Sequence, residues 1–191
     1  YSTAYNRLLL LAKKGKIGDV ISVDATCTSL ADGSGDDWNS ITAWGPTALL
    51  PVFQLLGTDY KDKNINSLLL DSAENFDLFT KIDFTYPNAV ASIKVGKGVK
   101  SEGELIISGT KGYIYVPAPW WKTDYFEIRF ENQNENKKYF YQLDGEGIRY
   151  ELVAFIKSIE LNKTGSYIDI NISKEISSVM EDFDNNKFNN L

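Results

Sequence analysis

Two adjacent tryptophans, Trp120 and Trp121, stand in the Pro-rich turn PAPWWKTDYF between two strand patterns. Neighbouring side chains on such a turn do not enter the same face of a sheet, so we expect at least one ring at a surface or a pocket rim. Tryptophan faces stack on sugar rings and on cofactors, which makes the turn a candidate binding site. A packed core or interface position is the alternative, because such loops often bury one tryptophan.

Two cations, Lys122 and Arg149, are candidates for holding an anionic group of a ligand. Lys122 follows the tryptophans directly, and Arg149 lies in GEGIRYELVAF just before a predicted helix. A guanidinium group binds a carboxylate or a phosphate through parallel hydrogen bonds. A surface ion pair explains Arg149 equally well.

The stretch WGPTALLPVFQLLG, residues 44–57, resembles an active-site helix in the residues that begin and end it. Pro46 is suited to a first helical position, an apolar run follows, and Gly57 ends the pattern. Trp44, Gly45 and Thr47 at its start are further candidates for a substrate pocket. The stretch nevertheless contains no acid, no base and no nucleophile.

Two other motifs fail on their spacing. GKGVKSEG has the glycines of a dinucleotide loop, but the strand pattern ELIISG follows where a helix is required, so we interpret it as a hairpin connection. ADGSGDDWNS lacks the bidentate glutamate of a calcium loop and is interpreted as a surface loop. The chain contains no histidine, the commonest general base and metal ligand. We therefore expect neither a catalytic residue nor a metal ligand in this chain.

The overall charge narrows the range of partners. A net charge of −6 and a pI of about 4.8 argue against nucleic acid and anionic membranes, which select basic surfaces. The single cysteine, Cys27, excludes an internal disulfide, and its strand face predicts a buried position. We see no signal peptide and no apolar run of the roughly 18 residues that suggest a membrane helix. We expect a reducing, cytoplasmic location.

The periodicity of apolar residues predicts the order of the elements. A helix over residues 4–14 precedes a strand in which alternate residues face the core. Six or seven strands follow between residues 68 and 143, and their short links make neighbours antiparallel. Two amphipathic helices end the chain. The inward residues of the first strand and of these two helices are Ile21, Val23, Ala25 and Cys27; Leu152, Phe155, Ile156 and Ile159; and Ile172, Ile176, Val179 and Phe183.

These elements predict one α+β domain over residues 1–191. Its expected architecture is an open, predominantly antiparallel β-sheet with the helices packed on one face. The other face, which we expect to be rich in aromatic side chains, then needs a second copy or a partner domain.

Four landmarks in order, AYNRLLLLAKKGKIGDVISVDAT, WGPTALLPVFQLLG, GELIISGTKGYIYV and RYELVAFIKSI, resemble a known family. They are similar to the C-terminal domain of the Gfo/Idh/MocA oxidoreductases, the family of glucose–fructose oxidoreductase and inositol dehydrogenase. The resemblance covers nearly the whole chain, and its most specific parts are GKIGDVISV and ISGTKGYIYV.

The resemblance implies a substrate-binding and oligomerisation domain of a longer oxidoreductase. Family members bind NAD or NADP on an N-terminal Rossmann domain that also holds a catalytic lysine, and neither is present in these residues. The sequence begins with tyrosine, so we expect a piece of a longer chain that by itself neither binds the cofactor nor catalyses. The implied substrate is a sugar, a polyol or a sugar derivative. The implied assembly is a homo-oligomer through the open sheet face.

One departure from the family leaves two hypotheses open. The family helix usually displays Asp-x-Gly-x-His or Asp-x-Gly-x-Tyr, and the matching positions here are Pro46, Ala48 and Leu50, none of which transfers a proton. Either the longer chain remains an oxidoreductase, or it is a non-catalytic sugar-binding or dimerisation module that retains the fold and has lost the active-site His or Tyr. A β-rich interaction domain unrelated to redox enzymes is a third reading.

Overall fold

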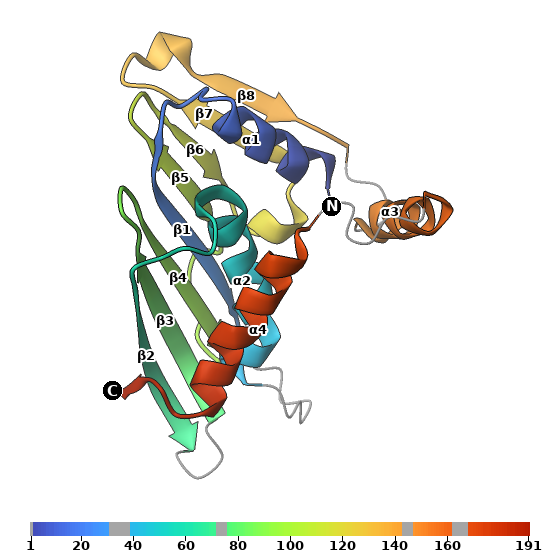
Figure 1. Ribbon diagram of the computed structural model, residues 1–191. Helices are drawn as coiled ribbons and strands as arrows, with labels where there is room; N and C mark the ends of the chain where they lie inside the picture. The colour runs from blue at the N-terminus through green and yellow to red at the C-terminus, as the bar shows by residue number, and fades with distance from the viewer. Residues whose placement is uncertain (1, 31–38, 72–75, 143–146, 162–167) are drawn as a thin grey trace.

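The computed structural model describes residues 2–30, 39–71, 76–142, 147–161 and 168–191 (Figure 1). Within these residues a nine-stranded sheet has the order β8-β7-β6-β5-β1-β4-β3-β2-β9. The helices are α1 (Thr3–Lys13), α2 (Ser40–Leu56), α3 (Ile148–Glu160) and α4 (Ile170–Asp184), with short 3-10 turns η1 (Trp120–Lys122) and η2 (Gln133–Glu135). The strands are β1 (Val20–Ser29), β2 (Asp62–Asp71), β3 (Phe76–Thr85), β4 (Val90–Lys97), β5 (Leu105–Gly109), β6 (Tyr113–Val116), β7 (Tyr125–Arg129), β8 (Lys137–Phe140) and β9 (Asn189–Asn190).

The sheet is mostly antiparallel, but its central strand β1 pairs in parallel with β4 and antiparallel with β5. Residues 98–104 therefore cross the end of β1, where the Gly98 N–H donates to the Ser29 carbonyl over 2.8 Å. The hairpin expected for GKGVKSEG is wrong, because a strand from much earlier in the sequence occupies the place between β4 and β5. Local spacing does not specify such a non-local pairing.

Helices α1, α2 and α4 form one layer on a single face of the sheet (Figure 1). The inward residues Val23, Ala25 and Cys27 of β1 are fully buried, as expected, and burial raises the pKa of the Cys27 thiol to about 12. Ile21 is exposed instead, because the register of β1 against β5 shifts between Val20 and Ser22 and ends the alternation there.

Helix α2 begins at Ser40, six residues before Pro46, the expected first helical position. Asn39 caps it by accepting a hydrogen bond from the Thr42 N–H over 2.9 Å, and the Asp77 carboxylate accepts one from the Ile41 N–H over 3.2 Å. Pro46 therefore lies inside the helix and not in its first turn, which corrects the expected entry. The N-terminus of α2 is therefore stabilised by the Asn39 cap and the buried Asp77, and not by the Gly-Pro pair.

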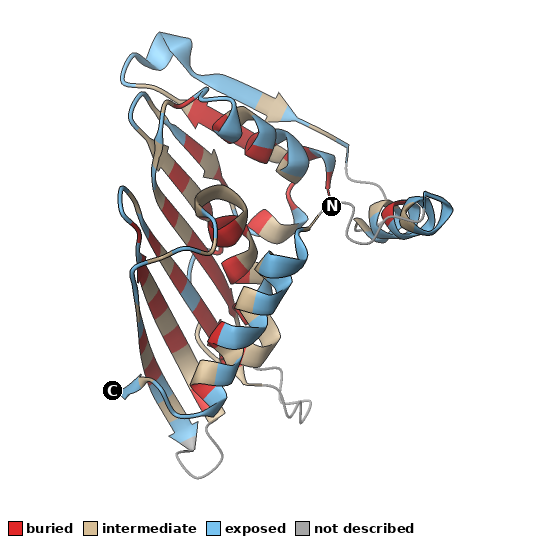
Figure 2. Cartoon of the chain, viewed as in Figure 1, coloured by how far each residue is buried: buried red, intermediate tan, exposed pale blue. Residues whose placement is uncertain are grey.

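The two C-terminal helices behave differently. In α4, Val179 and Phe183 are fully buried, so the expected stripe packs against the core. In α3 the expected stripe is exposed, and Phe155 retains 64% of its accessible surface (Figure 2). The expectation that both helices cover the sheet is therefore wrong for α3, since α1, α2 and α4 already occupy that face. No described helix is both long enough and apolar enough to cross a membrane.

The second face of the sheet has no helical layer among the described elements (Figure 1). Its side chains over β1, β3 and β4 include Asp24, Lys81, Asp83 and Lys94. The aromatic side chains on this face include Phe79 of β3 and a group at one end, over β6, β7 and β8: Tyr113, Tyr115, Tyr125 and Phe140. The face is thus more polar than expected, because charged side chains of β1, β3 and β4 share it with these aromatic rings.

Candidate functional site

A cavity of about 340 Å³ lies between α1, α2, α4 and the η1 turn, a volume at the lower end of the range for small-molecule sites. It is lined by Ser2, Tyr5, Pro46, Thr47, Leu50, Trp120, Trp121, Ile168, Ser173 and Ile176. We call it the tryptophan cavity. Its walls come from both ends of the sequence because α4 packs beside α2, and α1 contacts α2 from another side.

The two tryptophans of η1 occupy different environments in this wall. Trp120 is buried, and its indole N–H donates to the Thr26 carbonyl over 3.1 Å. Trp121 is partly exposed and stands nearly perpendicular to Trp120, with an interplanar angle of 86°. The ring of Trp44 lies behind Trp121 at a centroid distance of 4.9 Å, and its N–H donates to the Ser29 hydroxyl. Trp121 is thereby the ring of η1 that lines the cavity, is partly exposed and is contacted by another tryptophan.

The other predicted site residues are divided. Thr47 lines the tryptophan cavity, as do Pro46 and Leu50, two of the three positions matched to the family motif. Gly45 is buried, and a Cβ there would lie 3.1 Å from the Ile41 side chain, so its role is packing within α2. The third matched position, Ala48, is fully buried.

The structure does not bring the two predicted cations to this cavity. Lys122 is exposed at the end of η1, and Arg149 is exposed in the first turn of α3. Neither belongs to the lining. The predicted role of these two residues in holding an anionic group therefore has no support from the geometry.

Sequence reasoning missed several residues of the cavity. Tyr5 and Ile176 come from helices at opposite ends of the chain, and no local pattern indicates that the two meet across a cavity. The Tyr5 hydroxyl donates to the Gln54 side-chain carbonyl over 2.7 Å, and burial raises the pKa of Tyr5 far above its usual value. Tyr5 therefore stays protonated at neutral pH and is a poor general base.

The other polar side-chain groups of the lining residues are the hydroxyls of Ser2, Thr47 and Ser173 and the indole N–H of Trp121. The Ser2 hydroxyl already caps α1 by accepting a hydrogen bond from the Tyr5 N–H over 3.1 Å. The carbonyl of Thr47 has no α-helical donor, because residue 51 is a proline and lacks an N–H. Thr47 thus lines the cavity and carries both a hydroxyl and a carbonyl that lacks its helical donor. Such groups orient a substrate but do not exchange a proton with it at neutral pH.

Neither the start of α2 nor the segment GKGVKSEG forms a Rossmann-type dinucleotide loop. Such a loop places a phosphate at a free helix N-terminus after a glycine-rich turn. The N-terminus of α2 is occupied by the Asp77 carboxylate, and residues 98–104 lead into a strand. Within the described ranges, no three His, Cys, Asp or Glu side chains are grouped as metal ligands.

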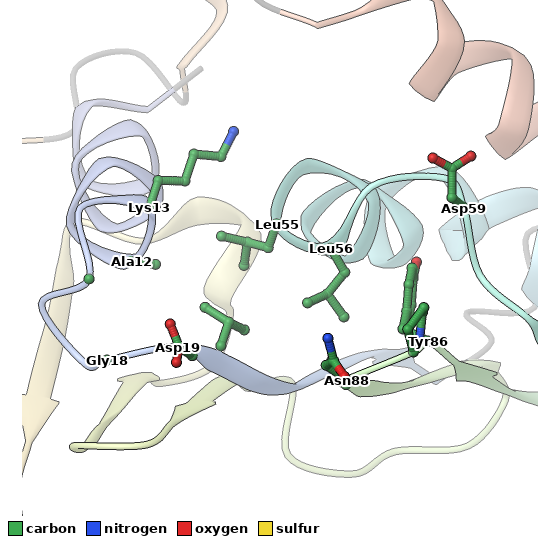
Figure 3. Close-up of a pocket in the computed structure, with 13 residues that line it drawn as sticks. Ala12, Lys13, Gly18, Asp19, Leu55, Leu56, Asp59, Tyr86 and Asn88 are labelled. Carbon is green, nitrogen blue, oxygen red and sulfur yellow. The ribbon is translucent and has the colours of Figure 1, made fainter.

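A second, larger hollow of about 600 Å³ lies where α1 and α2 end (Figure 3). Leu55 and Leu56 contribute apolar surface, and Lys13, Asp19 and Asp59 are charged residues of its lining. It contains none of the site residues predicted from the sequence. The tryptophan cavity is therefore the better candidate for the functional site.

Solved oxidoreductases share this fold. A 3-ketoreductase, KijD10, from Actinomadura kijaniata in complex with NADP and TDP-benzene is 11% identical, with a TM-score of 0.76 over 92% of this chain and 56% of its own. The UDP-N-acetylglucosamine 3-dehydrogenase GnnA from Acidithiobacillus ferrooxidans is 12% identical, with a TM-score of 0.71 over 88% of this chain and 54% of its own. An oxidoreductase from Agrobacterium radiobacter with NAD+, L-tartaric acid and magnesium is 15% identical, with a TM-score of 0.70 over 90% and 56%.

No protein-family model and no curated protein matches the sequence. This chain spans little more than half the length of the structures it resembles. At such low identity the likeness concerns the fold, and the open sheet with helices on one face agrees with the expectation from the sequence landmarks. The chain therefore has the fold of the C-terminal domain of Gfo/Idh/MocA-type oxidoreductases.

Proposed function

We propose that this chain is the C-terminal substrate-binding and oligomerisation domain of an NAD(P)-dependent oxidoreductase acting on a sugar, a polyol or a sugar derivative. The observation on which the proposal depends is the tryptophan cavity, placed beside the helix that matches the family's active-site helix. The neighbours in fold include a ketoreductase with bound NADP and a dehydrogenase of a sugar nucleotide, and these support the class of reaction.

In this proposal the cofactor belongs to a preceding domain. Ser2 lies in the wall of the tryptophan cavity, so a domain that precedes this residue would connect to the chain beside the cavity. A cofactor held there could face a substrate stacked on Trp121 and oriented by Thr47. The exposed apolar stripe of α3 supports the presence of another folded unit, since such a surface is costly in water.

The open sheet face is the proposed contact between copies. Asp24 and Asp83 flank Ser92 in one row across three strands, and Lys81 and Lys94 pair in the adjacent row. A two-fold rotation can set the lysine row of one copy against the aspartate row of the other. We expect the mass measured by light scattering to be that of a dimer, and we expect the Lys94→Glu variant to be a monomer. A monomeric mass for the unmodified protein at micromolar concentration contradicts this contact.

A second function is favoured by one observation. The groups that line the cavity among the described residues include no side chain that titrates near neutral pH. A sugar-binding or dimerisation module without catalysis needs no such group. The two functions differ in whether the full-length parent reduces its cofactor.

The test is a turnover assay of the full-length parent with NAD+ or NADP+ and a panel of sugars and polyols. Appearance of reduced cofactor supports the oxidoreductase, and we expect Trp121→Ala to raise KM at least about tenfold through the lost stacking surface. Leu10→Ala, at an exposed position of α1 outside the cavity lining, is the control and leaves KM unchanged. Ligand binding without reduced cofactor on any substrate instead establishes the non-catalytic module.

A further inference from the structure

The tryptophan cavity is chemically unlike the rest of the molecule. Charged residues make up 24% of the sequence, yet none of the described residues that line the cavity bears a formal charge. Burying a phosphate or carboxylate against such a wall leaves the anion without a partner and is strongly unfavourable. The predicted cations Lys122 and Arg149 lie outside the lining and do not change this balance.

The supply of hydrogen-bonding groups is also small. The Ser2 hydroxyl accepts from the Tyr5 N–H and the Tyr5 hydroxyl donates to Gln54, so each keeps only part of its hydrogen-bonding capacity. The Thr47 and Ser173 hydroxyls, the Trp121 indole N–H and the Thr47 carbonyl that Pro51 leaves without its helical donor complete the supply. A fully hydroxylated six-membered ring brings more donors and acceptors than these groups satisfy, and each unpaired polar group weakens binding.

The apolar surface is by contrast large and shaped for a ring. The Trp121 ring, in contact with the Trp44 ring at a centroid distance of 4.9 Å, lines the cavity together with Pro46, Leu50, Ile168 and Ile176. Planar or near-planar apolar faces gain most from such a wall, through stacking and through removal of apolar surface from water.

We propose that the tryptophan cavity selects an uncharged ring that is poor in hydroxyl groups, and that it discriminates against free polyols and phosphorylated sugars. This inference rests on the proposed function, because it names the chemical class of the ligand held at the same site. The ring stacks on Trp121, and one donor of the ligand reaches the Thr47 carbonyl.

The test compares three ligands that share one carbocycle: cyclohexanol, myo-inositol and myo-inositol 1-phosphate. The indole N–H signals of Trp120 and Trp121, assigned with Trp→Phe variants, are followed by ¹H–¹⁵N NMR during each titration. Cyclohexanol is expected to shift them saturably, myo-inositol to bind at least about tenfold more weakly, and the phosphate to cause no shift. Equal or tighter binding of myo-inositol overturns the inference and leaves the proposed function standing. Absence of any shift with all three ligands overturns both.

A gain of function makes the charge argument testable without disturbing the core. Ser173 is exposed on α4 and lines the cavity, whereas Ser178 is exposed on the same helix outside the lining. Ser173→Arg is expected to confer binding of myo-inositol 1-phosphate, and Ser178→Arg is the matched control that does not. Equal gains in both variants would show a general electrostatic effect and refute selection by the uncharged wall.

Discussion

Replacing a phenylalanine in α4 should lower stability far more than replacing one in α3. Phe183 of α4 is fully buried and stacks on Phe188 at a centroid distance of 4.8 Å. Phe155 of α3 retains 64% of its accessible surface. Phe183→Ala removes a packed aromatic ring, a change that typically lowers the free energy of unfolding by about 3–5 kcal/mol. Phe155→Ala removes a ring that mainly contacts water, so we expect a change within about 0.5 kcal/mol.

The assay is thermal and urea unfolding followed by circular dichroism. For a chain of this size, 1 kcal/mol corresponds to about 2–4 °C in Tm, so Phe183→Ala should lower Tm by roughly 6–20 °C and Phe155→Ala by no more than about 2 °C. The urea midpoint should fall in the first variant with little change in the slope.

The comparison also decides how the tryptophan cavity is held. Ile176 and Ser173 reach the cavity from α4, so loss of Phe183 loosens the wall that they form. A drop in Tm for Phe155→Ala as large as that for Phe183→Ala would refute the separation of α3 from the core. An unchanged Tm for Phe183→Ala would refute the docking of α4.

Three further predictions concern pH and close packing. Hydrogen bonds from Lys187 and Lys63 lower the pKa of Asp182. The stabilisation from Asp182 is therefore present above the unfolded pKa and is lost as pH falls through the folded pKa. Asp182→Asn should lower Tm at pH 7 and flatten the decline of Tm below about pH 4. Burial raises the pKa of Asp77, so the dependence of stability on pH has the opposite sign: stability is lost as pH rises through the folded pKa. Asp77→Asn should reduce this loss of stability with rising pH, and an unchanged pH profile of Tm would contradict the prediction. Gly109→Ala would bring a Cβ to 2.3 Å from the Ile17 carbonyl, and we expect at least about 2 kcal/mol of destabilisation in urea unfolding, whereas an unchanged midpoint would refute the close approach.

Local patterns were sufficient for much of the fold. The alternation through Cys27 and the stripe through Phe183 each depend on residues a few positions apart, and the structure confirms both burials. Short links with turn residues likewise predicted that the successive strands β5, β6, β7 and β8 are antiparallel neighbours. Such signals are local because the pleat of a strand and the pitch of a helix repeat over a few residues.

The candidate site was only partly accessible from the sequence. Trp120, Trp121 and Thr47, predicted as substrate contacts from the aromatic turn and from the helix of the matched type, line one cavity. Lys122 and Arg149 were chosen for their charge and lie elsewhere. The charge of a side chain indicates which groups it can bind, but the location of that side chain depends on which helices pack together.

The sequence by itself determined the composition of the molecule: a chain without histidine, with one cysteine, and with an α2 segment that contains no side chain for proton transfer. It also determined which faces of most elements are apolar. Only the tertiary structure decided that α4 covers the sheet while α3 does not, that β1 pairs in parallel with β4, and that Tyr5, Trp121 and Ile176 enclose one cavity. These outcomes depend on contacts between residues far apart in the chain, where several apolar faces compete for one sheet surface and the best-packed combination wins.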